Sequence, residues 1–184
     1  AGFPGRARPR RHWLDSSTGR SAPLIPTPSQ PQDVDRGLQE VSERVLPQLS
    51  KQMDDLAFNR ALISIWEIVG AGNKYIDETA PWALAKTEKD RPRLGTVLYQ
   101  TLESLRMIAL LLAAFMPSTS EKMWSQLGME ENLWEQNIKE NGKWGGLKPG
   151  KKVAKPTPLF PRIDPTKIPQ GAERRGRPHP RGRP

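Results

Sequence analysis

The sequence has no cysteine and only two histidines among its 184 residues. Without thiols it forms no disulfide bond and no thiolate metal site. His12 and His179 both lie in segments rich in Arg and Pro, where a metal site or a general base built on histidine is not expected. We therefore predict that the chain has neither catalytic residues nor metal ligands.

Long apolar runs are also missing. The longest, Met107 to Met116, has ten residues, about half of the ~20 that a helix needs to cross a bilayer. The first residues of the chain lack the apolar core of a signal peptide,. These absences favour a cytoplasmic protein that makes no contact with a membrane.

Basic charge is scarce in the middle of the chain, although the net charge is +9. Residues 1–31 carry five Arg and one Asp, and residues 151–184 carry ten basic and two acidic residues. Residues 32–150 carry 14 basic and 17 acidic residues, so the central region is slightly acidic. The high overall charge is therefore no evidence that the folded part of the chain attracts RNA.

Proline follows the same division, since 14 of the 19 prolines lie in the two basic ends. Segments of this composition bury too little apolar surface to offset the entropy of the chain. We therefore predict disordered basic segments at residues 1–30 and 166–184. A helical bundle is expected at 31–128, followed by an irregular extension at 129–165 that packs on the bundle.

The bundle is predicted from apolar residues that repeat at spacings of three and four, which is typical of one face of a helix. Three long helices are expected over residues 34–56, 58–76 and 94–115. Pro47 predicts a kink or break in the first helix, and Pro117 ends the third. No alternating strand pattern of useful length appears. The predicted fold class is all-α, an antiparallel helix bundle.

A short fourth helix is predicted after Pro117. Ser118-Thr119-Ser120-Glu121 has the spacing of a capping box, and Gly128 is placed to end the helix,.

One segment is more specific than a generic bundle. Residues 73–86 read Asn-Lys-Tyr-Ile-Asp-Glu-Thr-Ala-Pro-Trp-Ala-Leu-Ala-Lys and closely resemble a segment of bacterial methionyl-tRNA synthetases. Four further matches to this family occur in the family's order, at residues 58–66, 105–117, 120–128 and 159–163. The resemblance covers about residues 31 to 165. It implies the helical anticodon-binding domain of a class I synthetase.

The residues around Trp82 suit RNA on chemical grounds as well. Pro81 disfavours helix at Ala80, so Trp82 should stand at a helix end. An aromatic face with cations nearby, here Lys74 and Lys86, can stack on an unpaired base and hold its phosphates. The resemblance implies that the tryptophan matching Trp82 stacks on the anticodon and that Pro81 shapes the turn.

Each of these residues also has a plainer interpretation. Trp82 could be a packing residue, and Lys74 and Lys86 could be solvated surface charges. Asn73 is a candidate RNA contact, as are Tyr75 and Asp77, but all three could instead form a hydrogen-bonded brace between helices. The other tryptophans of the central region have structural interpretations. Trp66 and Trp124 are predicted to lie in the core, and Trp134 and Trp144 to attach residues 129–150 to the bundle.

The chain departs from the family in two respects. It lacks the His-Ile-Gly-His and Lys-Met-Ser-Lys-Ser motifs, so the ATP and methionine sites are expected only in the parent enzyme and the chain alone should be inactive. The family's first anticodon-domain helix carries an Asn-x-x-x-Arg pair that reads bases. It should fall within residues 1–25, but residues 1–31 contain no Asn. Translation in a shifted reading frame would explain this loss, and a native basic tail is the alternative.

The resemblance implies a fragment of methionine–tRNA ligase that binds the anticodon loop of methionine tRNA, with no cofactor of its own. The missing catalytic domain is a further expected partner. Two alternatives stay open, namely the anticodon domain of a leucyl-, isoleucyl- or valyl-type synthetase, and a helical fragment that binds only protein or has no function. Binding to an anticodon stem-loop distinguishes the last of these from the first.

Overall fold

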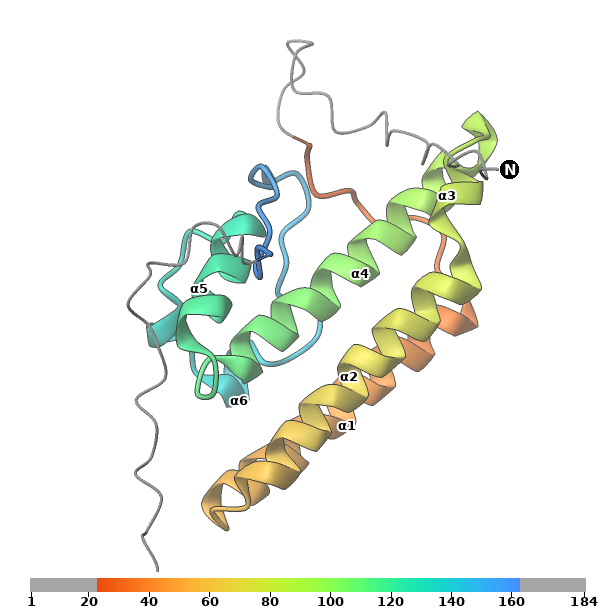
Figure 1. Ribbon diagram of the computed structural model, residues 1–184. Helices are drawn as coiled ribbons and strands as arrows, with labels where there is room; N and C mark the ends of the chain where they lie inside the picture. The colour runs from red at the N-terminus through yellow and green to blue at the C-terminus, as the bar shows by residue number, and fades with distance from the viewer. Residues whose placement is uncertain (1–22, 163–184) are drawn as a thin grey trace, which may run out of the picture.

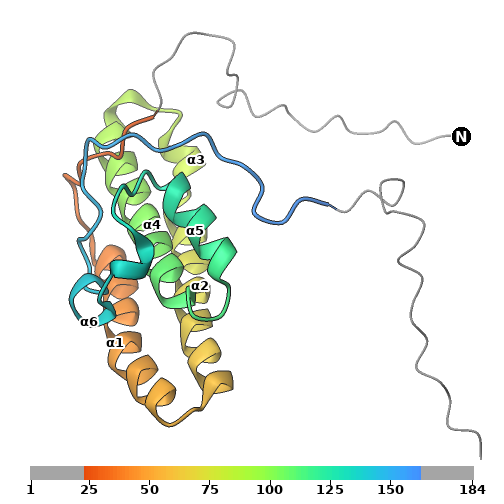
Figure 2. The ribbon, with the colours of Figure 1, turned by 90° about the vertical axis from the view of Figure 1, so that its left-hand side faces the viewer.

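The computed structural model describes residues 23–162, and the terminal segments predicted to be disordered lie mostly outside this part. Three helices of 22 residues each dominate the fold: α1 (Asp33–Asp54), α2 (Phe58–Thr79) and α4 (Arg91–Leu112). α1 and α2 form a hairpin, and α4 lies between this hairpin and the C-terminal part of the fold (Figures 1 and 2). Within residues 23–162 the only strand-like pairing is one isolated bridge. The predicted all-α class is confirmed.

The core forms where the predicted apolar stripes of the three long helices meet. Its central cluster joins all three of them and consists of Val45, Leu49, Ala61, Ile65, Ile68, Ile108, Leu111 and Leu112. The helical periodicity is therefore confirmed. No helix within residues 23–162 has both the length and the apolar character needed to span a membrane.

A kink or a break was predicted at Pro47, and the break does not occur, because α1 continues through this residue to Asp54. Pro47 has no N–H to donate to the Glu43 carbonyl four residues earlier. Both residues lie on the exposed side of α1. Water can therefore hydrate that carbonyl, and the helix tolerates the proline.

Two short helices follow α2. The backbone of Ala80 is left-handed, with φ 42° and ψ 61°, and its N–H donates to the Ile76 carbonyl at 3.0 Å. α2 therefore ends where Pro81 predicts, and Pro81 opens the four-residue helix α3 (Pro81–Leu84). A 3-10 turn, η2 (Glu88–Asp90), leads from α3 into α4.

α5 (Pro117–Gln126) does not begin with the predicted capping box. Met116 is its N-cap, Pro117 occupies the first turn, and no side chain caps the helix. The fixed φ of proline suits the first turn of a helix, which explains the earlier start. Gly128 ends the helix region as predicted, with φ +72°, and a Cβ at this position would overlap the Lys152 carbonyl.

Residues 129–162 form an irregular extension with two short helical turns, η3 (Leu133–Glu135) and α6 (Ile138–Asn141). The extension is attached to α4 through the Trp144 indole, which donates to Gln100 at 3.1 Å. It is attached to α5 through the Trp134 indole, which donates to Glu121 at 2.6 Å. The two tryptophans therefore attach the extension as predicted.

The prediction that Trp66 lies in the core is wrong, whereas the one for Trp124 is confirmed. Trp124 is 4% exposed and Trp66 is 56% exposed. Ile65 and Trp66 are adjacent candidates for the same apolar stripe. Ile65 occupies the core position and is fully buried, so Trp66 points outward.

The predicted disordered segment does not extend through residues 23–30. Ile25 is 2% exposed and packs with Tyr99 and Leu147. Its N–H donates to the Lys151 carbonyl and its carbonyl accepts from Gly150 N–H, both at 2.8 Å. One buried apolar side chain and this pairing with the C-terminal extension place the segment on the bundle.

Candidate nucleic-acid interface

The short helix α3 lies at one end of the helical bundle (Figure 1). Its residue Trp82 is 58% exposed. Leu84, two residues further on, packs against the cluster of Leu38, Tyr75 and Val97. Residues two apart on a helix point about 200° apart. The packing of Leu84 therefore turns the indole of Trp82 toward solvent, where it can stack on a ligand.

The predicted site residues do not all lie together. Pro81, Trp82 and the exposed Lys86 share α3 and the turn that follows it. Asn73 and Lys74 lie on α2 about six residues before its end, roughly 9 Å away along the helix axis. The Lys74 ammonium is 3.6 Å from the Glu78 carboxylate, so its charge is partly balanced.

A buried polar network lies next to α3. The Asp35 carboxylate accepts hydrogen bonds from Arg93 at 2.6 and 2.9 Å and from the Tyr75 hydroxyl at 2.6 Å. All three side chains are nearly inaccessible to solvent. The network joins the start of α1, the end of α2 and the start of α4. The hydrogen bond from Tyr75 to Asp35 confirms that Tyr75 braces two helices. Within residues 23–162, the side chains of Asn73 and Asp77 form no hydrogen bond between helices.

Burial and hydrogen bonding act in opposite directions on Asp35. Burial raises the pKa of Asp35, but the hydrogen bonds from Arg93, Tyr75 and the backbone of Gln32 lower it below its ordinary value of 3.8,. Burial, and then the hydrogen bond to Asp35, raise the pKa of Tyr75. The hydrogen bond to Asp35 raises the pKa of Arg93. At neutral pH the network therefore holds one carboxylate, one guanidinium and a neutral phenol.

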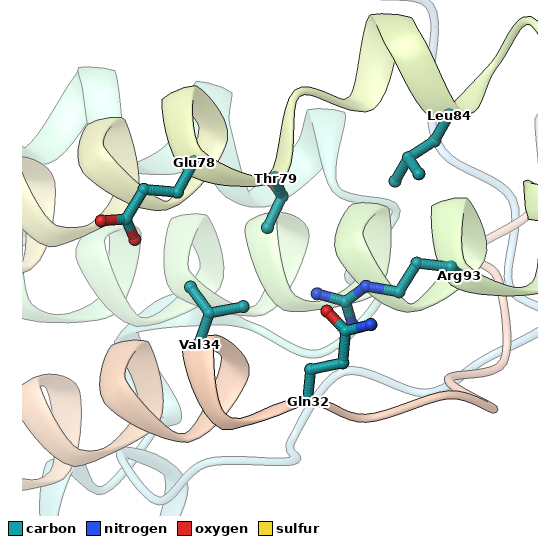
Figure 3. Close-up of a pocket in the computed structure, with 6 residues that line it drawn as sticks. All are labelled: Gln32, Val34, Glu78, Thr79, Leu84 and Arg93. Carbon is teal, nitrogen blue, oxygen red and sulfur yellow. The ribbon is translucent and has the colours of Figure 1, made fainter.

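A pocket of about 380 Å³ lies beside this network, between the start of α1 and the α2–α3 corner (Figure 3). It is lined by Gln32, Val34, Glu78, Thr79, Leu84 and Arg93. Sequence reasoning missed this pocket. Gln32 and Arg93 lie in segments without any motif, and only folding brings them to residues of the 73–86 segment. Within residues 23–162 no group of three His, Asp or Glu side chains could hold a metal ion.

Comparison with known proteins places these features in a family. The family described as the anticodon binding domain of methionyl tRNA ligase matches residues 25–176. The methionine–tRNA ligase of Caldanaerobacter subterraneus subsp. tengcongensis is 48% identical over 143 residues, which are 77% of this chain and 22% of that protein. The methionine–tRNA ligase of Lactococcus lactis is 44% identical over 132 residues, which are 72% of this chain and 20% of that protein.

A solved structure agrees with the sequence comparisons. The Mycobacterium tuberculosis methionyl-tRNA synthetase in complex with methionyl-adenylate has a TM-score of 0.69 and 33% sequence identity to this chain. The similarity covers 76% of this chain and 27% of that structure. The chain thus spans about a fifth of the length of the curated relatives that it matches. The protein belongs to the family of methionyl-tRNA ligase anticodon-binding domains.

Proposed function

We propose that this chain binds the anticodon stem-loop of methionine tRNA, with Trp82 stacking on an unpaired base of the loop. The observation that carries the proposal is the 58% exposed indole of Trp82 on a short helix. That helix is fixed by the left-handed turn at Ala80 and by the packing of the partly buried Leu84. A rigid, exposed aromatic ring gives an unpaired base a surface on which to stack.

The remaining candidate residues act around this ring. Lys86 follows it by four residues in the sequence and can hold a phosphate, while Lys74 and Asn73 reach a more distant part of the loop. The central region is slightly acidic overall, so stacking rather than bulk charge should supply most of the affinity. We propose that this domain recognises methionine tRNA through its anticodon loop, as part of a cytoplasmic ligase. We propose that a catalytic domain with the ATP and methionine sites is the partner of this domain in that ligase.

Replacing Trp82 with alanine tests the proposal. Loss of one base-stacking ring is expected to weaken stem-loop binding by about 1–3 kcal/mol, measured by fluorescence anisotropy with a labelled RNA. The melting temperature should hardly change, because the indole is mostly in solvent.

Trp134→Ala is the matched control, since Trp134 is exposed to a similar extent, 54%, but lies on the C-terminal extension. It should bind the stem-loop like the wild type. Equal affinity for wild type, Trp82→Ala and Trp134→Ala would contradict the stacking role. No binding by the wild type would instead favour a fragment that binds only protein or has no function.

A further inference from the structure

We propose that an apolar groove between α4, α5 and the C-terminal extension binds Trp13 and Leu14 of the chain's own N-terminal segment. The groove has a volume of about 490 Å³, within the range of roughly 300–1,000 Å³ that is usual for pockets that enclose a ligand. None of the candidate RNA contacts lines it. The inference therefore does not depend on the proposed function.

The accessible side of α4 presents leucines to the groove. After Arg91, every charged side chain of α4 is buried. The exposed residues of α4 after Pro92 are Leu98 and Leu105, at 42% and 37%, and both line the groove. A helix that faces water normally carries charged and polar residues on its outer side. This side of α4 therefore has the composition of a surface that another apolar group covers.

The other walls of the groove are apolar as well. α5 and its C-cap contribute Met123 and Leu127, and the extension contributes Leu159. Gln126 is the only polar residue among those that line the groove. Its amide is already paired with Thr157, since it donates to the hydroxyl at 3.0 Å and accepts from the backbone N–H at 3.2 Å. A phosphate or a sugar would find no charged partner here, so the groove suits apolar side chains.

The N-terminal segment enters the described part of the chain at this groove. Pro23, the first described residue, lines the groove, and Leu14 precedes it by nine residues. Nine residues span up to about 30 Å. Leu98 and Leu105 are seven residues apart on α4, which is roughly 10 Å along the helix axis. Trp13 and Leu14 can therefore reach every part of the groove.

Trp13 and Leu14 are the adjacent pair of large apolar residues in this segment. The only other large apolar side chain in residues 1–22 is that of Phe3, ten residues before Trp13. A tryptophan buries about 150–250 Å² of surface, and the gain from burial grows with the apolar area removed from water. The composition of residues 1–22 predicts disorder because it does not show that an apolar groove lies beside Pro23.

Two other occupants fit the groove less well. Residues 163–184 contain no Phe, Tyr or Trp, and their only large apolar residues are Ile163 and Ile168, five residues apart. A second copy of the chain is present at about micromolar concentration, whereas a short linker gives tethered residues an effective concentration of about 1 mM. The chain's own Trp13 and Leu14 therefore have the advantage.

Limited trypsin digestion of the full chain tests this inference. While Trp13 and Leu14 are bound, the neighbouring Arg11–His12 bond is cleaved only from the released state. With an effective concentration of about 1 mM and a dissociation constant of about 0.1 mM for the two side chains, binding slows this cleavage about tenfold.

Leu105→Asn removes the protection by placing an amide in the groove without a partner. Cleavage at Arg11 should then be about tenfold faster than in the wild type. Ile63→Asn is the matched control, because Ile63 is an exposed apolar residue of α2 that does not line the groove. It should be cleaved like the wild type, and melting temperatures recorded for both variants show that the bundle is folded.

The methyl signal of Met123 reports the occupant directly. In the full chain labelled with ¹³C-methyl methionine, Trp13→Leu should shift the Met123 signal, because the ring current of the bound indole is lost. The signal of Met53, which does not line the groove, should stay unchanged. Phe3→Leu is the matched control and should shift neither signal. These substitutions lie in the N-terminal segment, so the test holds even if Leu105→Asn lowers stability.

Each remaining outcome overturns the inference. Equal cleavage of the wild type and the groove variant, or an unchanged Met123 signal, would show that Trp13 does not bind there. Protection of the Lys167–Ile168 bond in place of the N-terminal bond would assign the groove to the C-terminal segment. A Met123 signal that changes with protein concentration would assign it to a second copy. All of these measurements are made without RNA, so a failure of the proposed function is seen separately.

Discussion

Replacing Glu103 with alanine is expected to lower the free energy of unfolding by about 3–5 kcal/mol. Glu103 is fully buried on α4, and its carboxylate accepts hydrogen bonds from Arg106 at 2.7 and 3.0 Å. It also accepts from the N–H groups of Gly145, Gly146 and Leu147 at 2.9, 3.0 and 2.8 Å. The variant leaves a buried guanidinium without its partner and three backbone donors without an acceptor.

A decrease in melting temperature of about 9–15 °C is expected for Glu103→Ala, since 1 kcal/mol corresponds to roughly 3 °C in a domain of this size. Glu67→Ala is the matched control. Glu67 is also helical and contacts an arginine, Arg44, at 3.1 Å, but both side chains are largely exposed. Its loss should change stability by less than about 1 kcal/mol. Similar melting temperatures for the two variants would contradict a stabilising role for the buried carboxylate.

Arg106 completes the attachment of the extension. Its guanidinium donates to the Asn141 and Lys143 carbonyls, both at 2.7 Å. Gly146 packs so closely on this group that a Cβ would lie 2.6 Å from its central carbon. Both partners of the ion pair therefore hold the loop at residues 141–147, Glu103 through backbone N–H groups and Arg106 through backbone carbonyls.

The long helices could be predicted from the sequence because apolar periodicity is a local property. The partners of Glu103 could not. In the sequence Glu103 and Arg106 are three residues apart, which is the spacing of an ordinary surface pair on a helix. They are buried only because a loop some 40 residues away folds over them, and no local pattern marks that loop as their partner.

Of the candidate site, too, only the features set by local sequence could be predicted. The sequence Ala80-Pro81-Trp82 predicted the end of α2 and a tryptophan at a helix terminus, because proline restricts the residue before it. The pocket beside α3 could not be predicted, since its lining comes from three separate segments. Asp35 carried no signal either, because a carboxylate in the first turn of a helix usually faces solvent.

Removing the charge of Asp35 is expected to destabilise the fold in a pH-dependent way. Asp35→Asn leaves the buried Arg93 guanidinium without its carboxylate, at a cost of about 3–5 kcal/mol at pH 7. The pKa of Asp35 is lower in the folded protein than its ordinary value of 3.8. Its contribution is therefore complete above that value and is lost as the pH falls through the lower, folded-state pKa.

The stability difference between the wild type and Asp35→Asn should thus be constant from about pH 7 to pH 5 and should shrink below about pH 4. Asp33→Asn is the control, because Asp33 lies in the same first turn of α1 but is fully exposed and 3.8 Å from Arg36. Both substitutions remove one negative charge near the helix N-terminus, so their shared effect on the helix dipole cancels in the comparison. Urea unfolding measured at several pH values provides the free energies. A gap between the two variants that stays the same from pH 7 to pH 3 would show that Asp35 stabilises the fold by its shape and not by its charge.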